Sequence, residues 1–141
     1  MERKNTDQLQ QELMTGNDLD RVLADNGSSF QGYALQERLQ ALFQRREISK
    51  TALARQSGIS EVYLHQVFSG RRTPSRNRLL CLCFGLGASV DEAQDLLRHA
   101  RLAPLYSRDR RDAIVIFGLS HGMALAEIND KLYAEDADTL C

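Results

Sequence analysis

The stretch KTALARQSGISEVYLHQVF, residues 50–68, constrains the fold more than any other part of the chain. Two short apolar patterns of helical period are separated by a few residues, with the small Ala54 in the first and Gly58 between them. Helices that cross steeply need a small side chain where their backbones approach. The tight turn between them needs the positive φ angle that glycine adopts without strain. With Leu64 and Val67 phased toward a common core, the stretch predicts two short helices joined by a tight turn.

The rest of the chain shows the same helical period and contains only two prolines, so we expect an all-α protein. Serines mark the start of several helices, because a serine side chain accepts a hydrogen bond from a free N–H of the first turn. These serines are Ser49, Ser60, Ser75 and Ser89, and Ser89 has Glu92 in the position of a capping box. The expected helices span residues 5–14, 17–25, 33–46, 50–57 and 61–69, continue after the caps Ser75 and Ser89, and end with two segments at 107–122 and 123–135.

Residues 25–32, DNGSSFQG, interrupt the helical pattern with turn-forming residues and mark the start of a main domain. We expect three parts: an N-terminal helical arm and linker (1–32), a five-helix main domain (33–100) and a C-terminal helical extension (101–141). The extension concentrates Ile114, Ile116, Phe117 and Leu119, which are too apolar for an open surface. The main domain, the arm or a second copy must cover them, so the extension is expected to act as a buttress or as a dimerisation element.

Charge is distributed unevenly along the chain. The whole sequence has a formal net charge of −1, which argues against a general nucleic-acid binder. Residues 1–30 carry a net charge of −3, whereas residues 31–78 hold nine basic and three acidic side chains, a net charge of +6. Such a local positive field attracts a phosphate backbone. Charge alone leaves open the alternative that these side chains form solvated helix faces.

Several classes of function find no support in the sequence. The histidines and the three cysteines have no metal-ligand spacing, so we expect reduced thiols, with Cys81 and Cys83 buried, and neither a metal nor a cofactor. No glycine-rich phosphate loop, nucleophile motif or recognisable acid–base pair occurs, so we do not expect an enzyme. No apolar run is long enough for a membrane span, and the N-terminus lacks the apolar core of a secretory signal, which predicts a cytoplasmic location.

The motifs between residues 48 and 97 read, in order, IS, LA, GIS, SGRRTP and GLGASVDEAQDLL. This run resembles the helix-turn-helix domain of the phage repressor and Cro family, also called the xenobiotic-response-element (XRE) type. The resemblance covers about residues 33–98. It implies a lambda-repressor-like five-helix bundle that binds double-stranded operator DNA, usually as a homodimer on a palindromic site, and acts as a transcriptional regulator.

The resemblance also assigns roles to individual residues. The start and outward face of the third helix of the main domain are implied to read bases: Glu61, Val62, Tyr63 and Gln66, with His65 beside them. Lys50 at the start of the second helix, with Arg71, Arg72 and Arg76 after the third, are implied to bind phosphates. The chemistry agrees, since arginine and lysine supply charge for phosphates and glutamine can pair with adenine. Valine can meet a thymine methyl group, and a carboxylate can accept from cytosine N4.

The sequence departs from the family pattern at two informative positions. Phe68 replaces the usual acidic residue at the end of the reading helix and is expected to pack inward or against the C-terminal helices. Glu61 places a carboxylate where a neutral or basic side chain is usual, and a carboxylate near DNA either reads cytosine or repels phosphate. An alternative function is therefore a protein-interaction module on the same scaffold, such as an antitoxin or an adaptor for a toxin or kinase partner.

Overall fold

The computed structural model of the chain describes residues 4–27 and 33–141. In these residues it contains nine α-helices and no strand, which confirms the all-α prediction. The helices are α1 (Thr6–Thr15), α2 (Leu19–Asp25), α3 (Tyr33–Arg46), α4 (Lys50–Gln56), α5 (Glu61–Phe68), α6 (Arg76–Leu86), α7 (Val90–His99), α8 (Arg110–Ser120) and α9 (Leu125–Ala134).

Local capping explains why the helices begin where the sequence predicts. Ser49, Ser60, Ser75 and Ser89 each accept a hydrogen bond from the backbone N–H three residues later, at 3.0 to 3.3 Å. The side chain of Glu92 closes the predicted capping box by accepting from the N–H of Ser89 at 2.9 Å. Each cap satisfies an N–H group that the first turn leaves without a partner inside the helix. The short helices α4 and α5 therefore have defined ends.

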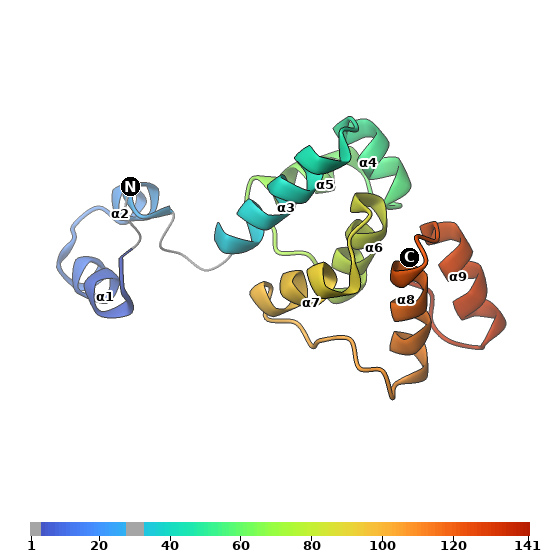
Figure 1. Cartoon of the computed structure of the whole chain (residues 1–141). Helices are drawn as coiled ribbons and strands as arrows, with labels where there is room; N and C mark the ends of the chain where they lie inside the picture. Colours follow the sequence, from blue (N-terminus) through green and yellow to red (C-terminus); the bar gives the residue numbers. More distant parts are fainter. Residues whose placement is uncertain (1–3, 28–32) are drawn as a thin grey trace.

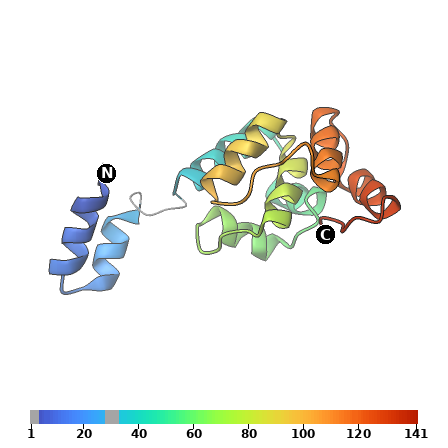
Figure 2. The same ribbon diagram turned by 90° about the horizontal axis from the view of Figure 1, so that it is seen from below.

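Helices α3 to α7 form a bundle, and α8 and α9 lie against one side of it, whereas α1 and α2 form a hairpin that stands apart (Figures 1 and 2). The centre of the bundle is α6, whose residues from Leu79 to Leu86 are all buried. Helices α3, α4, α7 and α9 contact it. A helix that is apolar on every side must be surrounded in this way.

The C-terminal helices share the hydrophobic core of the bundle. Val115 of α8 is fully buried and Leu119 is 7 % exposed, and on α9 Ile128 and Leu132 are almost completely buried. The apolar side chains of the C-terminal segment are therefore buried against the main domain, one of the three possibilities left open by the sequence. Phe117 is the exception, because it remains 56 % exposed and stacks on the ring of His121 at a centroid distance of 3.9 Å.

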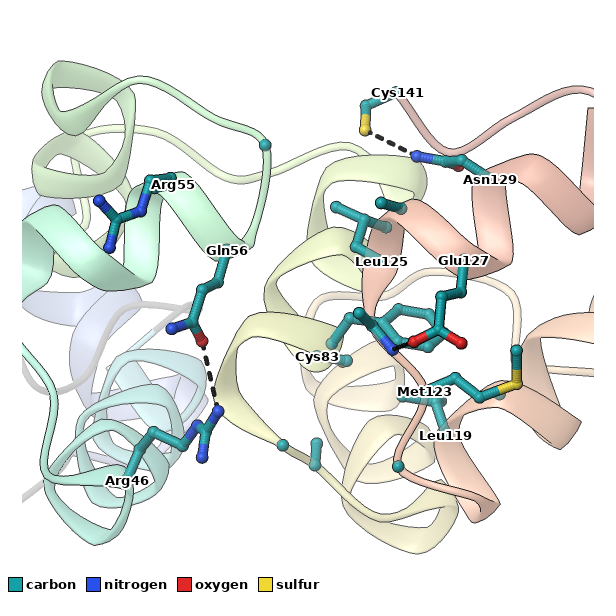
Figure 3. A pocket seen from close by; sticks show the side chains of 18 residues that line it. Arg46, Arg55, Gln56, Cys83, Leu119, Met123, Leu125, Glu127, Asn129 and Cys141 are labelled. Carbon is teal, nitrogen blue, oxygen red and sulfur yellow. Dashed lines mark hydrogen bonds between the residues drawn. The ribbon is translucent and has the colours of Figure 1, made fainter.

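The segment after α9 folds back to the turn between α4 and α5, which the sequence did not predict. Leu140 is 3 % exposed, and its N–H donates to Oδ1 of Asn129 at 2.8 Å. Arg111 fixes the same segment, since its Nε donates to the carbonyl of Asp138 at 2.7 Å and its Nη2 to that of Thr139 at 3.1 Å. Beside this contact, a cavity lies between α4 and the α8–α9 pair (Figure 3).

The turn glycine, Gly58, has φ +63°, as the sequence predicts, and also lies close to the C-terminal segment. A Cβ atom there would lie 3.1 Å from Sγ of Cys141 and 3.4 Å from Cδ2 of Leu125. We expect Gly58→Ala to lower the free energy of unfolding by about 2 kcal/mol, from the left-handed backbone and the crowding together. Urea unfolding measures this loss.

Gly122 provides a matched control for this substitution. It has φ +64°, but a Cβ atom there would meet nothing within 4 Å. Gly122→Ala should therefore cost only the backbone strain, about 1 kcal/mol. Equal losses for the two variants would mean that the contact between the turn and the C-terminal segment contributes nothing to stability.

Candidate nucleic-acid interface

Helices α4 and α5 and the turn between them have the geometry that the sequence predicts. Ala54 is 3 % exposed at the crossing point of the two helices, and its carbonyl accepts a hydrogen bond from the N–H of Ile59 at 3.1 Å. This bond closes the turn on the left-handed Gly58. The turn thus fixes the orientation of α5 relative to α4.

Helix α5 has an inner and an outer face. Leu64 and Val67 are buried in the core, whereas Glu61, Val62 and His65 are exposed. Val62 is 68 % exposed, so its side chain has little apolar cover within the chain. Gln66 lies one turn after Val62 and is half-buried. Of the four residues predicted to read bases, Glu61 and Val62 therefore lie exposed in the first turn of α5, and Gln66 follows Val62 one turn later.

Tyr63, the fourth, has a different environment. Its ring is half-buried and lies 5.6 Å from the guanidinium carbon of Arg72 and 4.4 Å from that of Arg78. These are cation–π distances, so the ring supports two guanidinium groups. Tyr63 faces the loop after α5 and the first turn of α6 rather than the outer face, so it holds cations beside the helix.

Lys50, at the first position of α4, lies over a pair of aromatic rings. Phe43 and Phe68 meet edge to face at a centroid distance of 5.6 Å, and the ammonium group of Lys50 lies 6.0 Å and 5.2 Å from their centroids. Phe68 is half-buried and packs inward, on Phe43 of α3 and on the hydrophobic core. The aromatic pair restricts where the Lys50 ammonium group can lie.

Seven of the nine cations of residues 31–78 divide into two groups, and the other two, Arg46 and Arg55, line the cavity of Figure 3. Three form ion pairs with the body of the protein: Arg38 with Asp95, Arg45 with Glu92 and Arg76 with Asp112. The Arg45 guanidinium lowers the pKa of the Glu92 carboxyl group, mainly through its hydrogen bonds. Four others flank α5 and form no ion pair in the part of the chain that the structure describes: Lys50, Arg71, Arg72 and Arg78, here called the basic rim.

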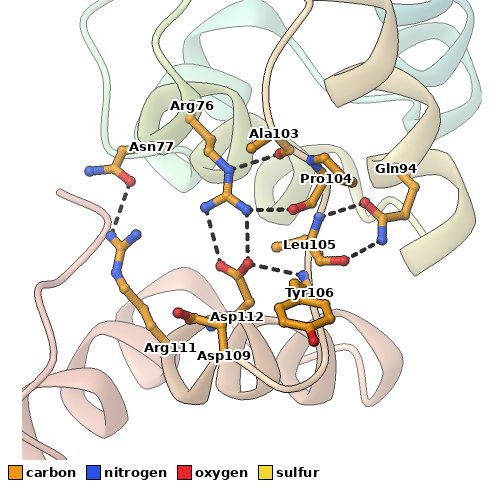
Figure 4. Close-up of polar contacts among 10 residues, drawn as sticks. All are labelled: Arg76, Asn77, Gln94, Ala103, Pro104, Leu105, Tyr106, Asp109, Arg111 and Asp112. Atoms are coloured by element: carbon orange, nitrogen blue, oxygen red, sulfur yellow. Dashed lines mark hydrogen bonds and ion pairs between the residues drawn. The ribbon is translucent and has the colours of Figure 1, made fainter.

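Arg76, which the resemblance implies to bind phosphate, forms several hydrogen bonds within the protein (Figure 4). Its guanidinium donates to both carboxylate oxygens of Asp112, at 3.1 and 3.0 Å, and to the carbonyls of Ala103 and Pro104, at 2.9 and 3.0 Å. These bonds use four of the five N–H donors of an arginine. Arg76 therefore joins α6 to α8 and has little capacity left for a phosphate.

Arg78, which the sequence pattern includes among the basic residues but does not assign to the site, lies two residues after Arg76 and has different surroundings. It lies in the first turn of α6, is exposed and stacks on Tyr63. Its position one turn after the cap Ser75 was readable from the sequence. The missing information was which of two nearby arginines faces inward, and that depends on Asp112, which lies 36 residues further along the chain.

Other candidate functional features are the cysteines, the possible metal ligands and the apolar helices. Burial raises the pKa of Cys81 and of Cys83 to about 12, which disfavours the reactive thiolate. Residues 4–27 and 33–141 contain no group of three histidine, cysteine, aspartate or glutamate side chains that could hold a metal ion. In the same residues, no helix is long and apolar enough to cross a membrane.

Comparison with known proteins agrees with this geometry. Residues 34–96 match a family model described as a helix-turn-helix domain. The match covers α3 to α7 up to the last turn of α7, including α4, the turn, α5 and the loop that carries Arg71 and Arg72. No curated protein and no solved structure gives a significant match to the chain.

Proposed function

Because residues 34–96 form a helix-turn-helix domain, we propose that this chain is a sequence-specific DNA-binding transcriptional regulator of the XRE type. The observation that supports this most is the basic rim. Its four cations lie beside α5, whose outer face exposes both polar and apolar side chains, and they form no internal ion pairs in the described residues. A protein surface with unpaired cations around a protruding helix suits a phosphate backbone around a groove.

In this proposal α5 enters the major groove of duplex DNA. Val62 contacts a thymine methyl group, Gln66 pairs with adenine, and Glu61 accepts a hydrogen bond from cytosine N4. The carboxylate of Glu61 then contributes to sequence specificity instead of only repelling phosphates. Lys50, Arg71, Arg72 and Arg78 bind phosphates on either side. Since Tyr63 already orders Arg72 and Arg78, these two side chains lose less conformational entropy when they bind.

We propose further that two copies bind a two-fold symmetric operator, because pairing two reading helices doubles the number of bases read. The chain would then consist of the arm (1–32), the DNA-binding domain (33–100) and an extension (101–141) that acts as a buttress. The shared core of the extension and the bundle favours this role over dimerisation. The regulator would work in the cytoplasm, without catalytic activity of its own.

Selection from a random duplex pool tests the proposal. The purified protein is bound to random-sequence DNA over a series of salt concentrations, and the retained DNA is sequenced. We expect retention to fall steeply with salt, because phosphate contacts release counterions, and one two-fold symmetric sequence to be enriched. Absence of retention at low salt would contradict DNA binding, and retention without enrichment would contradict sequence specificity.

A second candidate function is that of a protein-interaction module, and one observation favours it. The α1–α2 hairpin exposes Leu13, Met14, Leu19 and Leu23 while burying only Val22. Exposed apolar side chains on two neighbouring helices are typical of surfaces that bind other proteins. If the chain is a protein-interaction module, a partner protein should copurify with it. Deletion of residues 1–27 should abolish this copurification, and neutralising the basic rim should leave it unchanged.

A further inference from the structure

The cavity between the bundle and the C-terminal helices has the size and lining of a small-molecule site. Its volume is about 830 Å³, within the range of about 300 to 1,000 Å³ that is usual for ligand pockets. One wall comes from the end of α3 and from α4, and the other from α8 and α9 (Figure 3). The site is separate from the outer face of α5 and from the basic rim, none of whose residues lines it.

The floor of the cavity is apolar. Phe84 of α6, Leu119 of α8 and Leu125 of α9 line it, and each keeps 7 to 9 % of its surface exposed. These side chains belong to the hydrophobic core and also line the cavity. Covering such edges with an apolar group would remove them from water, which is favourable.

The wall formed by α3 and α4 carries two guanidinium groups, of Arg46 and Arg55, and neither has a counter-ion among the residues that the structure describes. The guanidinium of Arg46 donates to the carbonyl of Gly85 at 3.4 Å and to Oε1 of Gln56 at 3.3 Å, and both acceptors are neutral (Figure 3). It forms no ion pair with any described residue. Two of its five N–H donors are used, so three remain. The neighbouring Arg45 differs, because its guanidinium binds both oxygens of Glu92.

The opposite wall limits how much negative charge a ligand can carry. Glu127 lines the cavity there, and its Oε1 accepts from the N–H of Ala124 at 3.2 Å. A carboxylate on the far wall disfavours a ligand with anionic groups at both ends. The lining therefore suits a molecule with one anionic group near Arg46 and an uncharged apolar body over Phe84, Leu119 and Leu125.

From these contacts we propose that the cavity binds a small amphipathic monocarboxylate, with its carboxylate on Arg46 and its aromatic or acyl body on the apolar floor. Such a ligand bridges the end of α3, where Arg46 donates to Gln56 of α4, and α9, which supports the turn of the helix-turn-helix through Leu125. It is thus placed to stabilise the contact between the C-terminal helices and the turn. The binding itself does not depend on the proposed function, because it requires no DNA.

Nuclear magnetic resonance titration of the full chain tests this site with two probes of nearly equal shape, 4-phenylbutyrate and its neutral amide. We expect saturable shifts of the amide signals of Gly58, Gly118 and Gly122, which line the cavity, and binding of the carboxylate at least tenfold tighter than that of the amide. Arg46→Gln should remove this preference. Arg98→Gln, at an exposed arginine outside the cavity, should keep it.

A second variant separates loss of the site from loss of the fold. Ala126 is exposed at the cavity, so Ala126→Trp should block it and abolish the shifts without changing the circular dichroism spectrum. Three results would overturn the proposal. The first is no saturable shift for either probe, the second is equal affinity for carboxylate and amide, and the third is an unchanged preference in Arg46→Gln.

Discussion

Replacing Arg71 and Arg72 together with alanine should weaken binding to every duplex DNA sequence by about 100-fold at 0.1 M salt. Each phosphate contact contributes about −0.9 to the slope of log K against the logarithm of the salt concentration. At 0.1 M salt, one contact therefore raises the binding constant about tenfold. Both arginines are exposed, follow the reading helix directly and have no ion pair within the described chain. Removing two contacts should also lower the slope of this salt dependence by about 2.

The matched control is Arg21→Ala with Arg98→Ala, which changes the net charge of the chain by the same amount. Both of these arginines are highly exposed and pair only with neighbouring residues on their own helices. If binding depends on the net charge of the whole protein, both double variants will weaken it equally. If it depends on the basic rim, the control will bind almost as the unmodified chain does. Fluorescence anisotropy with a labelled duplex measures both affinity and salt slope.

The residues proposed to read bases should behave differently from the rim. If α5 reads bases, Val62 and Gln66 supply specificity rather than charge, so a change at either should alter which sequence is preferred while leaving non-specific binding and its salt slope unchanged. This contrast distinguishes a reading helix from a surface that merely attracts DNA. Tyr63 belongs with the rim in this respect, because its ring holds Arg72 and Arg78.

The sequence predicts most of the fold because the signals that define it are local. A serine cap and a helical apolar pattern lie within a few residues of each other, so α4 to α7 begin at the predicted residues. Gly58 is a local signal as well, since its φ angle depends on the turn it occupies. The match of residues 34–96 to a helix-turn-helix domain confirms what this pattern predicts.

The features that the sequence could not give depend on residues far apart in the chain. Arg76 forms an internal ion pair, whereas Arg78 lies exposed over the ring of Tyr63, and the position of Asp112 on α8 distinguishes them. The return of Leu140 to the core depends in the same way on Asn129 and on packing that no local pattern encodes. The cavity beside Arg46 lies between α4 and the α8–α9 pair, and these helices are also distant in sequence.

The ion pair between Arg76 and Asp112 should be among the strongest single links between the bundle and the C-terminal helices. Asp112 is 6 % exposed and accepts three hydrogen bonds, two from Arg76 and one from the N–H of Tyr106 at 3.0 Å. Asp112→Ala leaves the guanidinium of Arg76 largely buried without its counter-ion. We expect the free energy of unfolding to fall by about 3 kcal/mol, because breaking a buried pair leaves an uncompensated charge. For a chain of this size the melting temperature should fall by about 10 °C.

Glu135→Ala is the matched control for the stability loss expected of Asp112→Ala. Glu135 also pairs with cations, Arg110 at 3.7 Å and Lys131 at 3.4 Å, but both partners are well exposed to solvent. Its loss should cost less than about 1 kcal/mol, the usual value for a surface pair. Hydrogen exchange locates the effect, since Asp112→Ala should raise exchange in α8 and α9 before it does so in α3 to α7. If the two variants lose equal stability, the pair does not anchor the C-terminal helices, and their attachment then depends on the apolar contacts of Val115, Ile128 and Leu132 alone.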